Sequence, residues 1–253
     1  MRRYLDGRSM DGVAIERLRT FEPEALAKHE NGYWLAFSGG KDSCVILDLA
    51  KRSGVKFEAH HNLTTVDPPE LVRFVKTFPE VQIDKPKESM WQLIRRKGFP
   101  PLRNIRYCCE ALKECGGSGR MVITGVRWGE SNRRSKRQMT EACYRDKSGK
   151  HYIHPIIDWT TSEVWEYIRG QELPYCSLYD EGFKRVGCVL CPMSRETTRD
   201  IQRWPKLCAA WKRAIDSTDT DWQSWLNRKG PISKAKLDDD PVLFEDDPSV
   251  EAY

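Results

Sequence analysis

No apolar run in the 253-residue chain is long enough to cross a membrane, which argues against an integral membrane protein. The first residues, Met1 to Asp6, have no apolar stretch behind their charges, so they do not form a secretory signal. Internal repeats and low-complexity tracts are also absent. Charged residues make up 31% and hydrophobic residues 39% of the chain, as in soluble globular proteins. We therefore expect a cytoplasmic protein with no membrane partner.

Histidine is scarce, with 5 residues, and no spaced His/Cys pair completes a zinc site with His151 or His154. Cysteine is abundant instead, with 9 residues. In a reducing compartment cysteines rarely form structural disulfides, and an odd number cannot pair completely. Metal or cluster ligation is therefore the leading explanation for some of these thiols.

A short glycine-containing run follows an apolar segment, 33–37, and precedes a helical pattern over 43–53. The run is Ser38-Gly39-Gly40-Lys41-Asp42-Ser43. Glycines let a backbone approach a ligand closely, and the amide groups at the start of a helix attract anions. Lys41 and the serine hydroxyls add donors, whereas Asp42 suits a Mg²⁺ ion placed between its carboxylate and a phosphate. The run predicts an anion site, with an ordinary glycine-rich turn as the alternative.

A Walker A loop is excluded, because that pattern needs glycine where the chain has Leu35 and Ser or Thr where it has Asp42.

Strand patterns alternate with helical patterns in the first half of the chain. We expect strands at 33–37, 57–63, 81–83 and 121–124, and helices at 12–30, 43–53, 69–78 and 88–97. This alternation predicts an α/β fold with a parallel sheet flanked by helices. Ligands of such sheets bind beyond the carboxyl ends of the strands, so the loop, His61–Leu63 and Gly125–Arg127 should meet at one cleft. His60 and His61 either contact the nucleotide there or cap the strand.

The cysteines include a vicinal pair and a Cys-x-x-Cys pair. These are Cys108, Cys109, Cys188 and Cys191. Four thiolates suit an iron–sulfur cube or a structural zinc ion, although adjacent cysteines are awkward for tetrahedral zinc. Cys176 is an alternative ligand in place of one member of the vicinal pair.

The loop resembles the pyrophosphate-binding PP-loop of ATP pyrophosphatases, and the chain over about 30–200 resembles the phosphoadenosine phosphosulfate (PAPS) reductase family within that superfamily. The matching pieces are Ser38–Ser43, Cys108–Lys113, Thr124–Arg127, Pro155–Trp159 and Cys188–Cys191. The resemblance implies a Rossmann-like, adenine nucleotide alpha hydrolase-like fold with a helical C-terminal region. It also implies that the loop holds the pyrophosphate end of ATP while AMP is transferred, and that the four cysteines bind a [4Fe-4S] cluster. DNA phosphorothioation sulfur-transfer proteins carry a similar combination of the loop and the cluster cysteines.

The chain departs from the sulfonucleotide reductases of that family, because no cysteine follows Cys208 to serve as their C-terminal nucleophile. The loop Ser38–Ser43 also matches the ATP-cleaving form of the PP-loop better than the form that binds a sulfonucleotide. We therefore expect adenylation of an acceptor for sulfur transfer, with Lys41, Asp42 and Arg127 as catalytic residues. The loop and Gly125 would bind ATP, adenylyl sulfate or PAPS. The alternatives are a reductase that uses a partner's thiol, Cys176 or Cys208, and a non-catalytic nucleotide or nucleic-acid module. A sulfur donor or thiol reductant protein would be a partner.

The segment Arg127–Lys150 carries eight Lys and Arg residues against three acidic ones. It could bind nucleic acid through phosphates, cover the active site as a lid, or be a solvated loop. The sequence further predicts helices over 195–227 and an acidic arm over 237–253. We expect three divisions: a helical segment at 1–30, the PP-loop domain with the cysteines at 31–200, and an extension with an acidic tail at 201–253.

Overall fold

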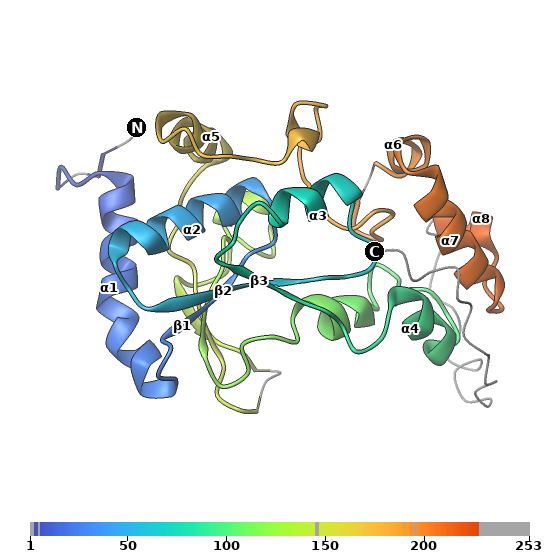
Figure 1. Ribbon diagram of the computed structural model, residues 1–253, viewed down its shortest axis with the longest axis horizontal. Coiled ribbons are helices and arrows are strands. Elements are labelled where there is room, and N and C mark those ends of the chain that lie inside the picture. The colour runs from blue at the N-terminus through green and yellow to red at the C-terminus, as the bar shows by residue number, and fades with distance from the viewer. Residues whose placement is uncertain (1–2, 5, 145–146, 195, 228–253) are drawn as a thin grey trace. The chain divides into compact units, whose positions relative to one another are not determined.

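The computed structural model describes residues 3–4, 6–144, 147–194 and 196–227 (Figure 1). The chain folds into two compact units, each built from separate stretches of sequence. The sheet unit comprises Met1–Asn62, Pro69–Asp84 and Gly116–Val186. The cysteine unit comprises Leu63–Pro68, Lys85–Cys115 and the described residues between Gly187 and Asn227. The divisions predicted at residues 30 and 200 stay a prediction.

The sheet unit contains a sheet of six strands, β1 to β6. Their bounds are Tyr33–Ala36, Phe57–Asn62, Val81–Asp84, Met121–Ile123, Thr140–Ala142 and His151–Ile153. The order is β3-β2-β1-β4-β6-β5, and all neighbours are parallel except β5 and β6. The predicted α/β fold with a parallel sheet is therefore confirmed. The strand order reverses direction between β1 and β4, which is where ligands of such sheets bind.

Helices of the sheet unit flank these strands (Figure 1). They are α1 (Met10–Lys28), α2 (Lys41–Ser53), α3 (Pro69–Val75) and α5 (Thr161–Gly170), with 3-10 turns η2 (Trp128–Glu130) and η3 (Ser177–Tyr179). Helix α1 packs on α2, and α2 packs on α5. Tyr33 ties α1 to β1, because its buried hydroxyl donates to the Leu18 carbonyl at 2.7 Å. A capping box of Thr160 and Glu163 begins α5.

The cysteine unit is helical. Its helices are α4 (Met90–Lys97), α6 (Thr197–Arg203), α7 (Pro205–Asp216) and α8 (Trp222–Leu226), with one π-helical turn, η1 (Cys109–Lys113). Their apolar core is aromatic: Trp211 contacts Trp91 at 5.5 Å and Trp225 at 5.1 Å between ring centroids. The predicted helical region over 195–227 is confirmed as α6, α7 and α8. The predicted acidic arm at 237–253 lies outside the described residues.

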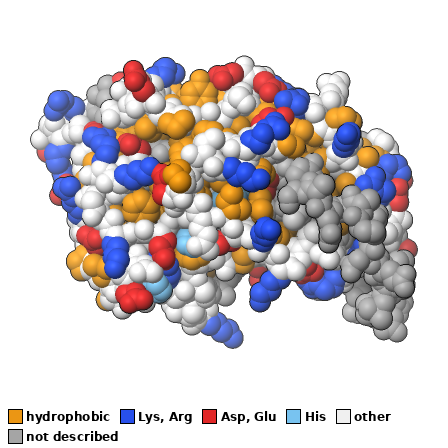
Figure 2. All heavy atoms as spheres, in the orientation of Figure 1, with side chains coloured by type: hydrophobic (Ala, Val, Ile, Leu, Met, Phe, Trp, Pro, Cys, Tyr) orange, Lys and Arg blue, Asp and Glu red, His pale blue; other side chains and the backbone are white. Residues whose placement is uncertain are grey.

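The basic segment is more ordered than the sequence indicated. It contains η2 and strand β5, which pairs antiparallel with β6. Each of these two strands has three residues, too few for an alternating pattern to stand out in the sequence. On the face drawn in Figure 2, Lys and Arg side chains are interspersed with Asp and Glu. No helix in the described part of the chain is both long and apolar enough to span a membrane.

Candidate nucleotide site and cysteine group

The glycine run forms the connection between β1 and α2, at the point where the strand order reverses. Gly39 has a φ of +72°, a conformation that glycine adopts without strain. A Cβ atom added there would lie 2.5 Å from Leu71 Cδ1. Two hydroxyl contacts hold the turn: Ser43 Oγ donates to the Gly40 carbonyl at 2.7 Å, and Ser38 Oγ lies 3.3 Å from Ser43 Oγ. Gly39 is therefore required by both conformation and space.

Gly125, just after β4, brings that strand end against the loop. A Cβ atom added there would lie 3.0 Å from Asp42 Cβ and 3.1 Å from the Asp42 carbonyl oxygen. The backbone atoms in this contact cannot swing aside as a side chain would. Of the three segments predicted to meet, Ser38–Ser43 and Gly125–Arg127 are therefore in contact in the sheet unit.

Asp42 joins two buried cations. Its Oδ2 accepts from Lys41 Nζ at 2.9 Å, and its Oδ1 accepts from Arg127 Nε at 2.7 Å. Lys41 is 5% exposed and Arg127 is 1% exposed. Opposite charges at this distance and burial hold each other firmly in place. We call these three residues the ion triad.

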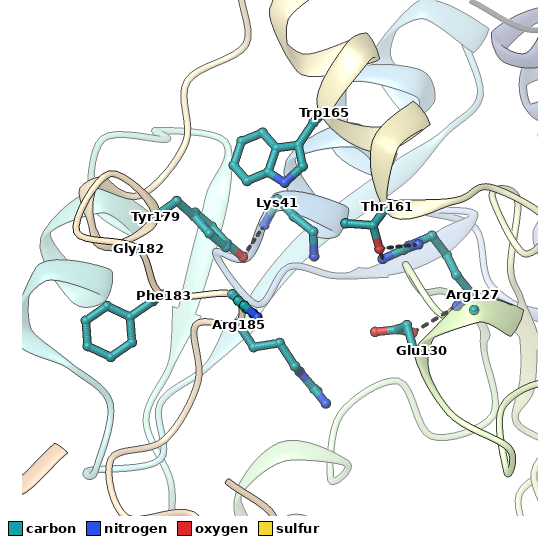
Figure 3. Close-up of a pocket in the computed structure, with 11 residues that line it drawn as sticks. Lys41, Arg127, Glu130, Thr161, Trp165, Tyr179, Gly182, Phe183 and Arg185 are labelled. Carbon is teal, nitrogen blue, oxygen red and sulfur yellow. Dashed lines mark hydrogen bonds between the residues drawn. The ribbon is translucent and has the colours of Figure 1, made fainter. Parts of the chain in front are cut away.

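Further contacts fix the position of Arg127. Its Nη1 donates to the Trp159 carbonyl at 3.1 Å, and both Nη atoms lie 3.4 Å from Thr161 Oγ1. Its backbone amide donates to Glu130 Oε2 at 3.0 Å (Figure 3). The guanidinium is therefore oriented by Thr161 at the start of α5 and by the Trp159 carbonyl just before that helix.

A pocket of about 550 Å³ opens beside the ion triad. It is lined by Lys41, Arg127, Gly129, Glu130, Thr161, Trp165, Tyr179, Gly182, Phe183, Lys184 and Arg185. Figure 3 shows Lys41, Arg127 and Arg185 around one cavity with Trp165 and Tyr179 at its side. Four of the lining side chains are basic and one is acidic, so the pocket suits an anion.

Sequence reasoning missed the pocket wall formed by Trp165 and the segment 179–185. That segment follows no helical or strand period, so its position could not be inferred from spacing. The one available signal was the basic pair Lys184-Arg185 shortly before the Cys-x-x-Cys motif.

The two histidines of β2 have structural partners. His60 stacks on Trp34 with 3.3 Å between ring centroids, and its Nδ1 lies 2.8 Å from Asp84 Oδ2. His61 Nδ1 lies 2.9 Å from the Phe37 carbonyl, immediately before the loop. Both side chains are buried. These contacts favour the strand-capping alternative over nucleotide contact.

The four candidate cluster cysteines lie in one unit. Cys108 hydrogen-bonds to Cys109, which raises the pKa of Cys108 and lowers that of Cys109, and the charges of Cys188 and Cys191 also act on Cys108. Cys188 Sγ lies 3.4 Å from Thr64 Oγ1. Within the described ranges, no group of three or more His, Cys, Asp or Glu side chains is arranged to hold a metal ion. Cys176 belongs to the sheet unit, where it is buried.

Side chains of the basic segment divide into paired and exposed sets. Arg134 pairs with Glu130 at 2.5 Å, and Arg137 pairs with Glu141. Arg133 and Lys136 are exposed. Trp128 is 42% exposed, and its Nε1 donates to the Arg137 carbonyl at 2.7 Å. A nucleic-acid contact would therefore depend on Arg133, Lys136 and Trp128, because Arg127 is buried.

The family model of the phosphoadenosine phosphosulfate reductase domain matches residues 32–194. This chain belongs to that family. The assignment confirms the resemblance read from the loop and places the chain in the PP-loop superfamily. The adenosine 5'-phosphosulfate reductase of Oceanobacillus iheyensis is a relative with 38% identity, over 67% of this chain and 75% of its own length.

Other relatives are longer than this chain. Two uncharacterized proteins of Methanocaldococcus jannaschii are 32% and 29% identical over 70% and 82% of this chain. The chain spans about half of their length, with 46% and 47% covered.

Solved structures share the fold of this family member. A PAPS reductase from Candida auris in complex with phosphate has 23% identity and a TM-score of 0.51, with 74% of this chain and 97% of that chain covered. An FMN adenylyltransferase from Candida glabrata has 14% identity and a TM-score of 0.51, with 71% and 60% covered. These two proteins and the Oceanobacillus relative are enzymes by name.

Proposed function

We propose that this PAPS reductase family member binds ATP beside the loop Ser38–Ser43 and transfers AMP to an acceptor, with release of pyrophosphate. The observation that carries the proposal is the ion triad beneath a glycine turn at the reversal of strand order. Lys41 and Arg127 are held there by their ion pairs with Asp42. Cations fixed in advance stabilise developing negative charge without having to reorganise during the reaction.

The leaving pyrophosphate would be stabilised by the loop. The amides of Gly39 and Asp42 have no acceptor among the described residues, and Asp42 lies in the first turn of α2. Such open amides and the helix N-terminus favour an anion. Lys41 would neutralise charge that builds on the β-phosphate as the α–β bond breaks, while Arg127 would orient the α-phosphate or the acceptor. Lys184 and Arg185 supply further positive charge to the pocket.

Magnesium is best treated as part of the substrate. Each Asp42 carboxylate oxygen already accepts from a cation, which favours a positioning role for this side chain. The predicted role of Asp42 as a magnesium ligand stays a prediction. In our proposal Mg²⁺ enters with ATP, and Asp42 acts by positioning Lys41 and Arg127.

We further propose that Cys108, Cys109, Cys188 and Cys191 hold a [4Fe-4S] cluster. Four thiols are the donor set that such a cluster needs, and all four belong to one unit, although the described side chains are not arranged around a common metal position. The positive charge of Lys113 also acts electrostatically on the thiols of Cys188 and Cys109. A cluster bound by these four thiolates would brace the cysteine unit, and a sulfur donor or thiol reductant protein would be the partner in sulfur transfer.

The decisive experiment follows ATP with pyrophosphate release and AMP formation as readouts. The variant Lys41→Ala should lose both. The control Lys51→Ala lies on the same helix, where Lys51 is half-exposed and pairs with Glu80, and it should react normally. Sulfite release from adenylyl sulfate with a thiol reductant would instead identify a reductase. Nucleotide binding with neither product would identify a non-catalytic module.

A second, separate proposal is that the acceptor of AMP is a nucleic acid. Trp128 has an exposed ring, and Arg133 and Lys136 are exposed in the same basic segment; exposed aromatic and basic side chains together suit single-stranded nucleic acid. The double variant Arg133→Ala, Lys136→Ala should weaken RNA or DNA binding and flatten its salt dependence. Unchanged binding curves would remove nucleic acid from the list of acceptors.

A further inference from the structure

The hydroxyl of Tyr179 sits on the anion loop. The Lys41 backbone amide, the first of α2, donates to Tyr179 Oη at 3.0 Å. A Cβ atom added to Gly40 would lie 3.5 Å from the same oxygen. In Figure 3 this contact lies at the side of the pocket that also holds the Lys41 side chain. Tyr179 Oη therefore occupies an acceptor position on an amide that faces the anion site.

The tyrosine ring is held in place from several directions. It packs edge-on against Trp165 with 5.1 Å between ring centroids. Lys41 Nζ lies 5.9 Å from the ring centroid. The backbone around it is a closed turn, because the Tyr179 amide donates to the Cys176 carbonyl at 3.1 Å and the Gly182 amide donates to the Tyr179 carbonyl at 3.0 Å. A ring anchored in this way stays beside the loop when a ligand enters.

The proton of this hydroxyl is available to a ligand. Tyr179 Oη accepts one hydrogen bond from Lys41, and no acceptor for its own proton lies among the described residues. A tyrosine hydroxyl is both donor and acceptor, so one capacity is unused. Burial raises the pKa of Tyr179, so the hydroxyl keeps its proton at neutral pH and remains a donor.

We propose that Tyr179 is a phosphate ligand: its hydroxyl, oriented by the Lys41 amide, donates a hydrogen bond to an oxygen of the pyrophosphate moiety of the nucleotide. This inference rests on the proposed nucleotide site and adds a residue outside the glycine loop. The chain after η3 returns to the same pocket, where Lys184 and Arg185 line the wall together with Tyr179.

The test is isothermal titration of the parent chain, Tyr179→Phe and Tyr175→Phe with ATP, pyrophosphate and AMP. Tyr175 is a matched control: its ring packs edge-on against the same Trp165, but its hydroxyl donates to Asp180 at 3.0 Å instead of reaching the loop. A hydrogen bond to a charged group implies that Tyr179→Phe binds ATP and pyrophosphate about 10- to 100-fold more weakly. AMP affinity should be unchanged, and Tyr175→Phe should match the parent for all three ligands.

The outcomes separate this inference from the proposal on which it rests. If the parent binds neither ATP nor pyrophosphate, the nucleotide site itself is wrong, and the role of Tyr179 is rejected with it. If the parent binds both ligands and Tyr179→Phe binds pyrophosphate equally or more tightly, the Tyr179 hydroxyl is not a phosphate ligand, and only this inference fails. An equal loss for AMP and pyrophosphate would indicate a general disturbance of the pocket and would also overturn it. Equal thermal midpoints of the two variants check that both are folded.

Discussion

Replacing Asp42 with asparagine separates two roles for this carboxylate, a partner of buried cations and a ligand of magnesium. Asparagine keeps the shape of the side chain but removes its charge. Lys41 and Arg127, 5% and 1% exposed, would then face each other without the anion between them. Arg127 would keep its hydrogen bond to the Trp159 carbonyl, whereas Lys41 Nζ would lose its ion-pair partner.

The expected cost follows from the burial of the triad. Removing one partner of a buried ion pair costs about 3–5 kcal/mol, because a charge is left uncompensated. For a chain of this size each kcal/mol lowers the melting temperature by about 2–4 °C, so Asp42→Asn should melt roughly 6 to 20 °C below the parent. Pyrophosphate should restore much of this loss, since its oxygens can replace the carboxylate between the two cations.

Thermal unfolding with and without pyrophosphate, in the absence of magnesium, measures both effects. Stabilisation by pyrophosphate should be at least as large in Asp42→Asn as in the parent, because the ligand then compensates two buried cations that lack their anion. The matched control is Glu58→Gln, which removes the carboxylate partner of another buried arginine, Arg120, in the same unit. That variant should be destabilised without any change in its response to pyrophosphate.

Two results would refute the reasoning. If Asp42→Asn melts with the parent, the triad does not stabilise the folded chain. If pyrophosphate stabilises the parent only with Mg²⁺ and does not stabilise Asp42→Asn at all, Asp42 is a metal ligand and the ion pairs are secondary.

Three further predictions concern other parts of the molecule. Gly125→Ala should reduce ATP affinity, measured by titration, because the added methyl group meets the backbone of Asp42 at 3.1 Å; unchanged affinity would contradict the close approach. Cys108→Ser should lower the iron and sulfide content of anaerobically purified protein, whereas the exposed Cys115→Ser should not, and equal contents would remove Cys108 from the ligands. Burial lowers the pKa of His154, so the unfolded chain binds its proton more readily and stability should fall below about pH 6.5. The urea midpoints of unfolding at pH 7.5 and 5.5 should lie closer together in His154→Gln than in the parent. An equal difference between the two midpoints in both proteins would refute this assignment.

The sequence predicted the part of the site that local chain geometry determines. The apolar run before Ser38 and the glycine turn after it required a strand, a sharp turn and a helix start, and these are present as β1 and α2. It could not predict that Asp42 bridges Lys41 and Arg127, because the partner is 85 residues away and pairing depends on where β4 ends. Tyr179 was missed for the same reason, as its position is set by the turn around Cys176 and Gly182.

The loop also bears on the choice between adenylation and reduction. A site that only cradles a finished sulfonucleotide must recognise phosphate oxygens, and open backbone amides suffice for that. A site that breaks the α–β bond must in addition stabilise charge that grows on the departing pyrophosphate, so rigid cations at that point are needed. Lys41 and Arg127 meet this demand, since each is held by Asp42 and Arg127 is also held by Trp159 and Thr161. Their fixed positions favour ATP cleavage, and a loss of turnover with intact ATP binding in Arg127→Lys would support that argument.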